Sequence, residues 1–127
     1  MKQIWIVDDD EEMIRAVQLM LQLLEYETRY FLSARPAAQE LLTGNRPDLL
    51  ILDINMPEVS GLDLLEFMRR RKDLKEIPIV MLSTEAADVL VDKALGMGAD
   101  AYVTKPVAVE ELEEAVQKAF RAHGIYL

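Results

Sequence analysis

The stretch Leu49-Leu50-Ile51-Leu52-Asp53-Ile54-Asn55-Met56-Pro57 decides the fold of this chain. An unbroken apolar run leads into a single aspartate, and a proline follows shortly after. A short apolar run bounded by turn signals indicates a strand that is buried on both faces. Pro57 ends it, because proline has no N–H for the ladder. Asp53 is therefore expected at the carboxyl end of a central strand, the edge at which ligands collect in open α/β sheets.

On both sides of this stretch, short apolar runs alternate with segments of helical periodicity. Strands are predicted at Ile4–Val7, Thr28–Leu32, Leu49–Leu52, Ile77–Leu82 and Ala99–Thr104. Helices are predicted over Met13–Leu24, Ala34–Leu42, the segment from a Ser60 cap to the basic run Arg69–Lys72, Ala86–Leu95 and Val109–Phe120. Ser33 is expected to cap the second helix as Ser60 caps the third. Five strand–helix units imply right-handed crossovers and one parallel sheet with helices on both faces.

The composition narrows the class of protein. A length of 127 residues fits a single domain, residues 1–127, with its own core. The net charge of -9 argues against nucleic-acid binding by this domain and against an anionic membrane surface. The sequence has no cysteine, which excludes disulfides and thiolate sites. No signal peptide and no run of about 20 apolar residues is present, so we expect a soluble, cytoplasmic domain without membrane contact.

Polar and charged side chains follow four of the five predicted strands. They are Asp8 and Asp9 after the first strand, Asp53 after the third, Ser83 and Thr84 after the fourth, and Lys105 after the fifth. The carboxyl ends of parallel strands meet at one edge of a sheet, so these groups are expected to converge.

The convergent groups suggest phosphoryl chemistry. Three carboxylates in one crevice repel each other unless a cation offsets their charge. Oxygen ligands without histidine or thiolate point to a hard cation, Mg²⁺ before Ca²⁺. Lys105 and the Ser83 hydroxyl are able to contact phosphoryl oxygens. A carboxylate nucleophile in these surroundings is suited to forming an aspartyl phosphate.

At these residues the chain resembles the response-regulator receiver domain of two-component signalling. The matching motifs are Val7-Asp8-Asp9-Asp10, Leu52-Asp53-Ile54-Asn55-Met56-Pro57 with Gly61, Met81-Leu82-Ser83-Thr84, and Ala101-Tyr102-Val103-Thr104-Lys105-Pro106. They have the right order and spacing, and the resemblance covers essentially the whole chain. It implies a flavodoxin-like, doubly wound (βα)5 fold, a three-layer α/β sandwich whose parallel five-stranded sheet has the order 2-1-3-4-5.

The resemblance also implies a role for each motif residue. Asp53 would accept the phosphoryl group of a sensor histidine kinase or phosphotransfer protein. Asp9, Asp53 and the backbone carbonyl of Asn55 would bind Mg²⁺ directly, with Asp8 acting through water. Ser83 and Lys105 would contact the phosphoryl oxygens, and Lys105-Pro106 would be a cis peptide. Tyr102 would be the aromatic switch residue that reports movement of Ser83.

By the same resemblance the domain would be a switch and not a turnover enzyme, catalysing only its own phosphorylation and dephosphorylation. Its responsive face would be Ala86–Leu95, Ala99–Thr104 and the last helix, where a partner, a second copy or an output domain docks. The chain would be either a stand-alone regulator or a domain of a longer one.

Several alternatives stay open at this level. Thr84 is a second hydroxyl beside Ser83, which we favour because it directly follows the strand. A phosphohydrolase of the haloacid-dehalogenase type would need an acid–base aspartate where Asn55 stands. A flavin or nucleotide binder would need a glycine-rich loop after the first strand. A receiver that is never phosphorylated, acting as a scaffold, is the remaining possibility.

Some conspicuous residues have simpler interpretations. Arg69–Lys72 is expected to complement the helix dipole and not to bind nucleic acid. The seven methionines are expected to fill the core and crevices. His123 is the only histidine, lies near the C-terminus and is expected to be exposed.

Overall fold

The computed structural model describes residues 1–127, and its centre is one parallel five-stranded sheet. The strands are β1 (Gln3–Val7), β2 (Glu27–Phe31), β3 (Leu49–Asp53), β4 (Ile79–Ser83) and β5 (Ala101–Thr104). Their order is β2-β1-β3-β4-β5, and every neighbouring pair is parallel. This confirms the doubly wound α/β topology expected from the sequence.

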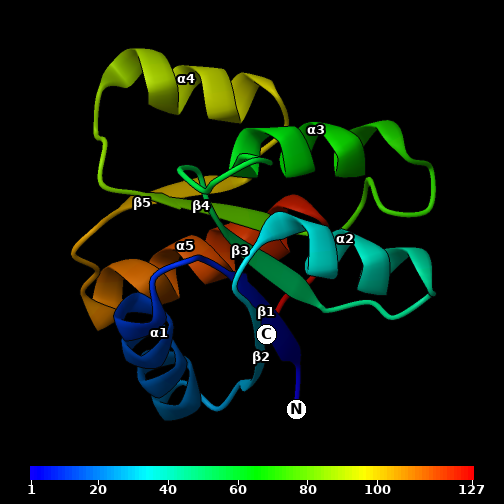
Figure 1. Cartoon of the computed structure of the whole chain (residues 1–127). Helices are drawn as coiled ribbons and strands as arrows, with labels where there is room; N and C mark the ends of the chain where they lie inside the picture. Colours follow the sequence, from blue (N-terminus) through cyan, green and yellow to red (C-terminus); the bar gives the residue numbers. More distant parts are fainter.

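The five helices cover both faces of the sheet. They are α1 (Glu11–Leu23), α2 (Ala34–Leu42), α3 (Gly61–Arg70), α4 (Asp88–Gly96) and α5 (Val109–Ala122). Figure 1 shows α1 and α5 on one face and α2, α3 and α4 on the other, which makes three layers. The arrangement is the flavodoxin-like sandwich, with the central strands shielded from water on both sides.

Alternate strand residues build two separate cores. Ile4 and Ile6 of β1 face the core beneath α1 and α5, whereas Trp5 and Val7 face the core beneath α2 and α3. All five residues of β3 and all five of β4 are buried, as their apolar runs predict. The edge strand β2 is largely exposed, which explains its weaker apolar pattern.

Side chains cap two of the five helices where they begin at the carboxyl edge of the sheet. Asp10 accepts hydrogen bonds from the amides of Glu12 and Met13 and caps α1. Ser60 and Asp63 form a reciprocal capping box at the start of α3, which confirms the expected Ser60 cap. Ser33 occupies the N-cap position of α2, but its side chain makes no capping hydrogen bond, so that prediction was only half right.

Some element limits differ from the prediction for local reasons. Strand β4 begins at Ile79 and not at Ile77, because Pro78 has no amide hydrogen for the ladder. Strand β5 begins at Ala101, since the amide of Ala99 is bonded to the carbonyl of Ala94 in α4. Helix α3 buries Leu64, Leu65 and Met68, and the partly buried Leu62 packs against the same core. Separately, none of the five helices has both the length and the apolar character needed to cross a bilayer.

Glu25, just after α1, adopts a left-handed backbone with φ of 68°. A non-glycine residue pays about 1 kcal/mol for this conformation. Glu25→Gly removes this strain, but glycine loses more conformational entropy on folding, which offsets part of the gain. We therefore expect a net increase of about 0.5 kcal/mol in the free energy of unfolding. Glu25→Ala is the matched control, because it removes the charge and keeps the strain. Urea unfolding followed by Trp5 fluorescence would measure both, and equal stability of the two variants would contradict the strain argument.

Candidate functional site

Neighbouring parallel strands bring two buried aspartates together at the carboxyl edge. Val7 of β1 is paired in register with Leu52 of β3, so the residues that follow them, Asp8 and Asp53, lie side by side. Asp8 is fully buried and Asp53 is 3% exposed, whereas Asp9 is exposed. One carboxylate oxygen from each of the three residues lies within 4.8 Å of the others. The predicted acidic cluster is thus present in the fold.

Lys105 projects into this cluster from the end of β5. Its Nζ lies 3.0 Å from Asp8 Oδ2 and 3.2 Å from Asp53 Oδ1, and its side chain is only 10% exposed. The Lys105 amide donates to the carbonyl of Ser83 at 2.7 Å, which fixes the backbone at the ends of β4 and β5. The Lys105-Pro106 peptide is cis, as predicted. One ammonium group therefore serves two buried carboxylates.

Burial and charge change the proton affinities at the site. Burial away from water raises the pKa of Asp53 to about 6, and repulsion from the nearby Asp8 carboxylate is the second contribution. The positive charge of Lys105 acts in the opposite direction. Burial by itself would lower the pKa of Lys105, but the Asp8 and Asp53 carboxylates outweigh it and raise that pKa. The site therefore holds excess negative charge that one lysine does not fully offset.

The residues present fit a hard divalent cation. Asp8 Oδ2 is buried, accepts no backbone or other neutral hydrogen bond, and is paired with the Lys105 ammonium at 3.0 Å. Its other oxygen, Oδ1, accepts the amide of Asp10 at 2.9 Å. Three clustered carboxylates that share one ammonium group, with no histidine or cysteine among them, match the oxygen chemistry of Mg²⁺.

The fourth strand contributes Ser83 at its last position. Ser83 is fully buried and its Oγ accepts the amide of Glu85 at 3.1 Å, whereas Thr84 is exposed. The hydroxyl of Tyr102, in β5, donates to the Glu85 carbonyl at 2.7 Å. Both side chains thus bind the backbone of Glu85 in the β4–α4 loop: the buried Ser83 binds its amide and Tyr102 binds its carbonyl.

Asn55 lies in the loop between β3 and α3, two residues after Asp53. Asn55 is exposed, and the next turn includes Glu58 in a left-handed conformation with φ of 65°. Gly61 closes the loop, because its amide donates to the Ile54 carbonyl at 2.9 Å. A Cβ at Gly61 would lie 2.0 Å from the backbone oxygen of Asp53. The sequence analysis included Gly61 in a motif but did not predict that its Cα packs against the backbone of Asp53. Glycine is the residue that permits such close contact between backbones.

A shallow cleft of about 160 Å³ opens beside the acidic cluster. Asp9 forms one wall, Pro57 and Glu58 of the β3–α3 loop another, and Arg35 of α2 a third. The exposed side of the site is therefore reachable from solvent past Asp9, while Asp8 and Asp53 stay shielded.

The sequence is similar to known regulatory proteins along most of its length. Residues 4–117 match the profile of the response regulator receiver domain. The chain is 37% identical over 113 residues to chemotaxis protein CheY1 of Helicobacter pylori, covering 88% of this chain and 91% of that protein. It is 35% identical over 124 residues to the transcriptional regulatory protein BasR of Escherichia coli, covering 96% of this chain and 54% of that protein.

The fold is similar to solved structures as well. Chemotaxis protein CheY4 of Vibrio cholerae superposes with a TM-score of 0.83 at 29% identity, covering 94% of this chain and 98% of that one. A signal receiver domain of a signal transduction histidine kinase from Syntrophus aciditrophicus superposes with a TM-score of 0.85, also at 29% identity, over 98% of this chain and 93% of that one.

Proposed function

The chain belongs to the response regulator receiver domain family of two-component systems, and from that premise we propose that it is a phosphorylation switch whose acceptor is Asp53. The observation that carries the proposal is the environment of this carboxylate. Asp53 is almost fully buried, lies within 4.8 Å of the Asp8 and Asp9 carboxylates and pairs with Lys105 at 3.2 Å. These groups match the requirements of phosphoryl transfer to a carboxylate.

Each group has a defined part in the proposed reaction. An oxygen of Asp53 bonds to the donor phosphorus as the bond from phosphorus to the donor's leaving nitrogen breaks. Asp8, Asp9, Asp53 and the carbonyl of Asn55 would hold Mg²⁺, Asp8 through water, and the bound ion would supply charge neutralisation to the phosphoryl oxygens. Lys105, already in the crevice, pairs with one of those oxygens.

The β4–α4 loop supplies the conformational response. In the unmodified protein Ser83 Oγ accepts the Glu85 amide. When the Ser83 side chain turns to donate its hydroxyl hydrogen to a phosphoryl oxygen, Oγ moves away from the Glu85 amide and the loop is drawn toward Asp53. Tyr102 follows, because its hydroxyl is bonded to the Glu85 carbonyl. A few kilocalories per mole of differential contact are enough to shift a two-state equilibrium of this kind.

The surface formed by α4, β5 and α5 is the proposed output face. Val89 of α4 is 82% exposed and Leu95 is 39% exposed, which leaves apolar side chains available to a partner. A groove of about 270 Å³ runs along β5 and α5, lined by Tyr102, Glu111 and Lys118 among others. The proposed partners are a sensor histidine kinase or phosphotransfer protein as donor, and an output domain or a second copy at this face.

Phosphorylation is tested by incubating the protein with Mg²⁺ and acetyl phosphate and measuring the intact mass. We expect the mass to increase by one phosphoryl group, and expect no increase with EDTA or with Asp53→Ala. Asp92→Asn, an exposed carboxylate of α4, is the matched control and should be modified like the wild type. A mass gain that survives Asp53→Ala would refute the assignment, as would the absence of any gain in the wild type.

A further inference from the structure

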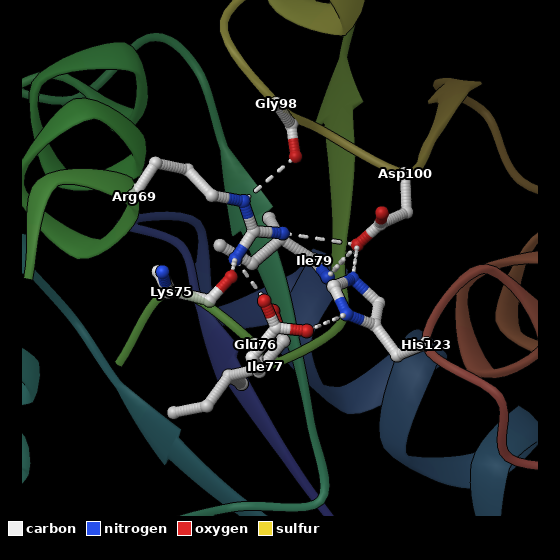
Figure 2. A network of polar contacts seen from close by, with 8 residues as sticks. All are labelled: Arg69, Lys75, Glu76, Ile77, Ile79, Gly98, Asp100 and His123. Carbon is white, nitrogen blue, oxygen red and sulfur yellow. Dashed lines mark hydrogen bonds and ion pairs between the residues drawn. The ribbon is translucent and has the colours of Figure 1, made fainter. Parts of the chain in front are cut away.

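A second buried polar network lies at the opposite end of the strands, around Arg69 of α3. Its side chain is only 14% exposed, and the guanidinium donates to three backbone carbonyls and one carboxylate. Nε donates to the Gly98 carbonyl at 2.8 Å, and Nη2 donates to Asp100 Oδ2 at 3.0 Å. Nη1 donates to the carbonyls of Lys75 at 2.9 Å and Ile77 at 2.8 Å. Figure 2 shows this guanidinium between the α3–β4 and α4–β5 connections.

Asp100 extends the network to the first residue of β4 and to the end of α5. Its Oδ2 also accepts the Ile79 amide at 2.8 Å and lies 2.9 Å from His123 Nε2. The other ring nitrogen of His123 lies 3.5 Å from the exposed Glu76 carboxylate. The His123 side chain is 13% exposed, so the expectation that it faces solvent was wrong. Arg69 was expected only to complement the dipole of its helix, but its side chain also links the α3–β4 and α4–β5 connections through four hydrogen bonds.

The network holds the C-terminal end of α4 firmly. The amides of Met97, Gly98 and Ala99 close the helix on carbonyls of its last turn. Gly98 has φ of 109°, and a Cβ there would lie 2.9 Å from Arg69 Cγ, so helix end and arginine are in close contact. A guanidinium that forms four charge-assisted hydrogen bonds is costly to displace, because the partly buried carbonyls of Gly98 and Ile77 would lose their donor.

The N-terminal end of α4 has few comparable contacts. Ala94, in its C-terminal half, is the only buried residue of the helix. Ala87 occupies the N-cap position and has no side-chain hydrogen bond to give, and Val89 is 82% exposed. The preceding loop is held through Glu85, by Ser83 and Tyr102. Low apolar burial and a missing cap are the marks of a segment that opens easily.

We propose that Arg69 is a positioning residue that fixes the C-terminal end of α4, so that the helix pivots about Gly98 when the β4–α4 loop moves. The trigger rests on the proposed phosphorylation, whereas the fixed end is a property of the unmodified protein. Motion at Asp53 would then reach the N-terminal half of α4 and stop at the network.

Amide hydrogen exchange of the unmodified full chain, followed by NMR, tests the fixed end without any variant. The amides of Met97, Gly98 and Ala99 are expected to exchange at least about tenfold more slowly than those of Leu90 and Val91. Both groups are hydrogen-bonded within or next to α4. Equal rates along the helix would overturn the proposal.

Variants assign the effect to Arg69. Arg69→Lys keeps the charge but loses the planar fork, and should accelerate exchange at 97–99 by about tenfold. His123→Ala is the matched control, since it breaks the α5 arm only. It should accelerate exchange at Gly124 and Ile125 and leave 97–99 unchanged. The proposal is wrong if Arg69→Lys leaves 97–99 unchanged, or if His123→Ala affects 97–99 as strongly as Arg69→Lys does.

The pivot itself is tested with beryllofluoride and Mg²⁺ as a phosphoryl mimic. Chemical-shift changes are expected over residues 84–91 and should fall away by 97–100 in the wild type, while in Arg69→Lys they should extend through 97–100. Shift changes of equal size along the whole wild-type helix would contradict the pivot. If the intact mass shows no phosphorylation of Asp53, the proposed function fails, and the exchange gradient of the unmodified protein still decides whether Arg69 fixes α4.

Discussion

Replacing Gly61 with alanine is expected to lower the free energy of unfolding by about 3 kcal/mol, at the upper end of overpacking effects. The added Cβ would lie 2.0 Å from the Asp53 carbonyl oxygen, 2.8 Å from its carbon and 2.9 Å from Ile54 Cα. All three are backbone atoms of a buried strand end and cannot rotate away as a side chain would. Either α3 or the β3–α3 loop must therefore move.

The same displacement should impair the candidate metal site, because the loop that moves also carries Asn55. We expect Mg²⁺ affinity to fall together with stability, measured by unfolding through Trp5 fluorescence with and without Mg²⁺. Gly96→Ala is the matched control, since a Cβ at that helical position meets nothing within 4 Å. It should be neutral or stabilising by up to about 1 kcal/mol. A Gly61→Ala protein as stable as Gly96→Ala would contradict the close approach.

Replacing Asp53 with asparagine is expected to make the metal-free protein more stable by about 3 kcal/mol at neutral pH while removing the phosphoryl acceptor. Burial and the Asp8 carboxylate disfavour the charged form and raise the pKa of Asp53 from 3.8 to about 6. A carboxyl whose pKa is raised in the folded state binds more protons there than in the unfolded state. Wild-type stability therefore falls as the pH rises from about 4 to 6, relative to the variant.

The measurement is urea unfolding of both proteins in EDTA across this range. The difference in free energy of unfolding should be small near pH 4, grow up to about pH 6 and stay constant above it. Added Mg²⁺ should stabilise the wild type and have less effect on the variant, which lacks one charged ligand. Asp92→Asn on the exposed face of α4 serves as control and should show no such window. A variant less stable than wild type at pH 7 would show that Lys105 outweighs the repulsion.

The acidic site was predictable because its members follow directly from strand ends. Asp8, Asp53 and Lys105 each come at the point where an apolar run stops, and parallel strands place all such points at one edge. The resemblance then assigned the roles of Asn55 and Tyr102, which spacing alone does not give. Those two roles remain proposals.

The sequence by itself determined the strand–helix alternation, the parallel sheet and the acidic edge, since periodicity, turn residues and strand ends are local signals. The cis Lys105-Pro106 peptide was expected only from the family resemblance. Only the tertiary structure revealed that Arg69, Asp100 and His123 meet. They lie in a helix end, a loop and a second helix end, 31 and 23 residues apart. Helix and strand periodicity cannot predict contacts between such distant positions, because these contacts depend on the length of each helix and the path of each connection. Gly61 shows the same limit. The sequence identified it as a motif residue, but only the packing of α3 against β3 shows that a Cβ there would lie 2.0 Å from the Asp53 carbonyl oxygen.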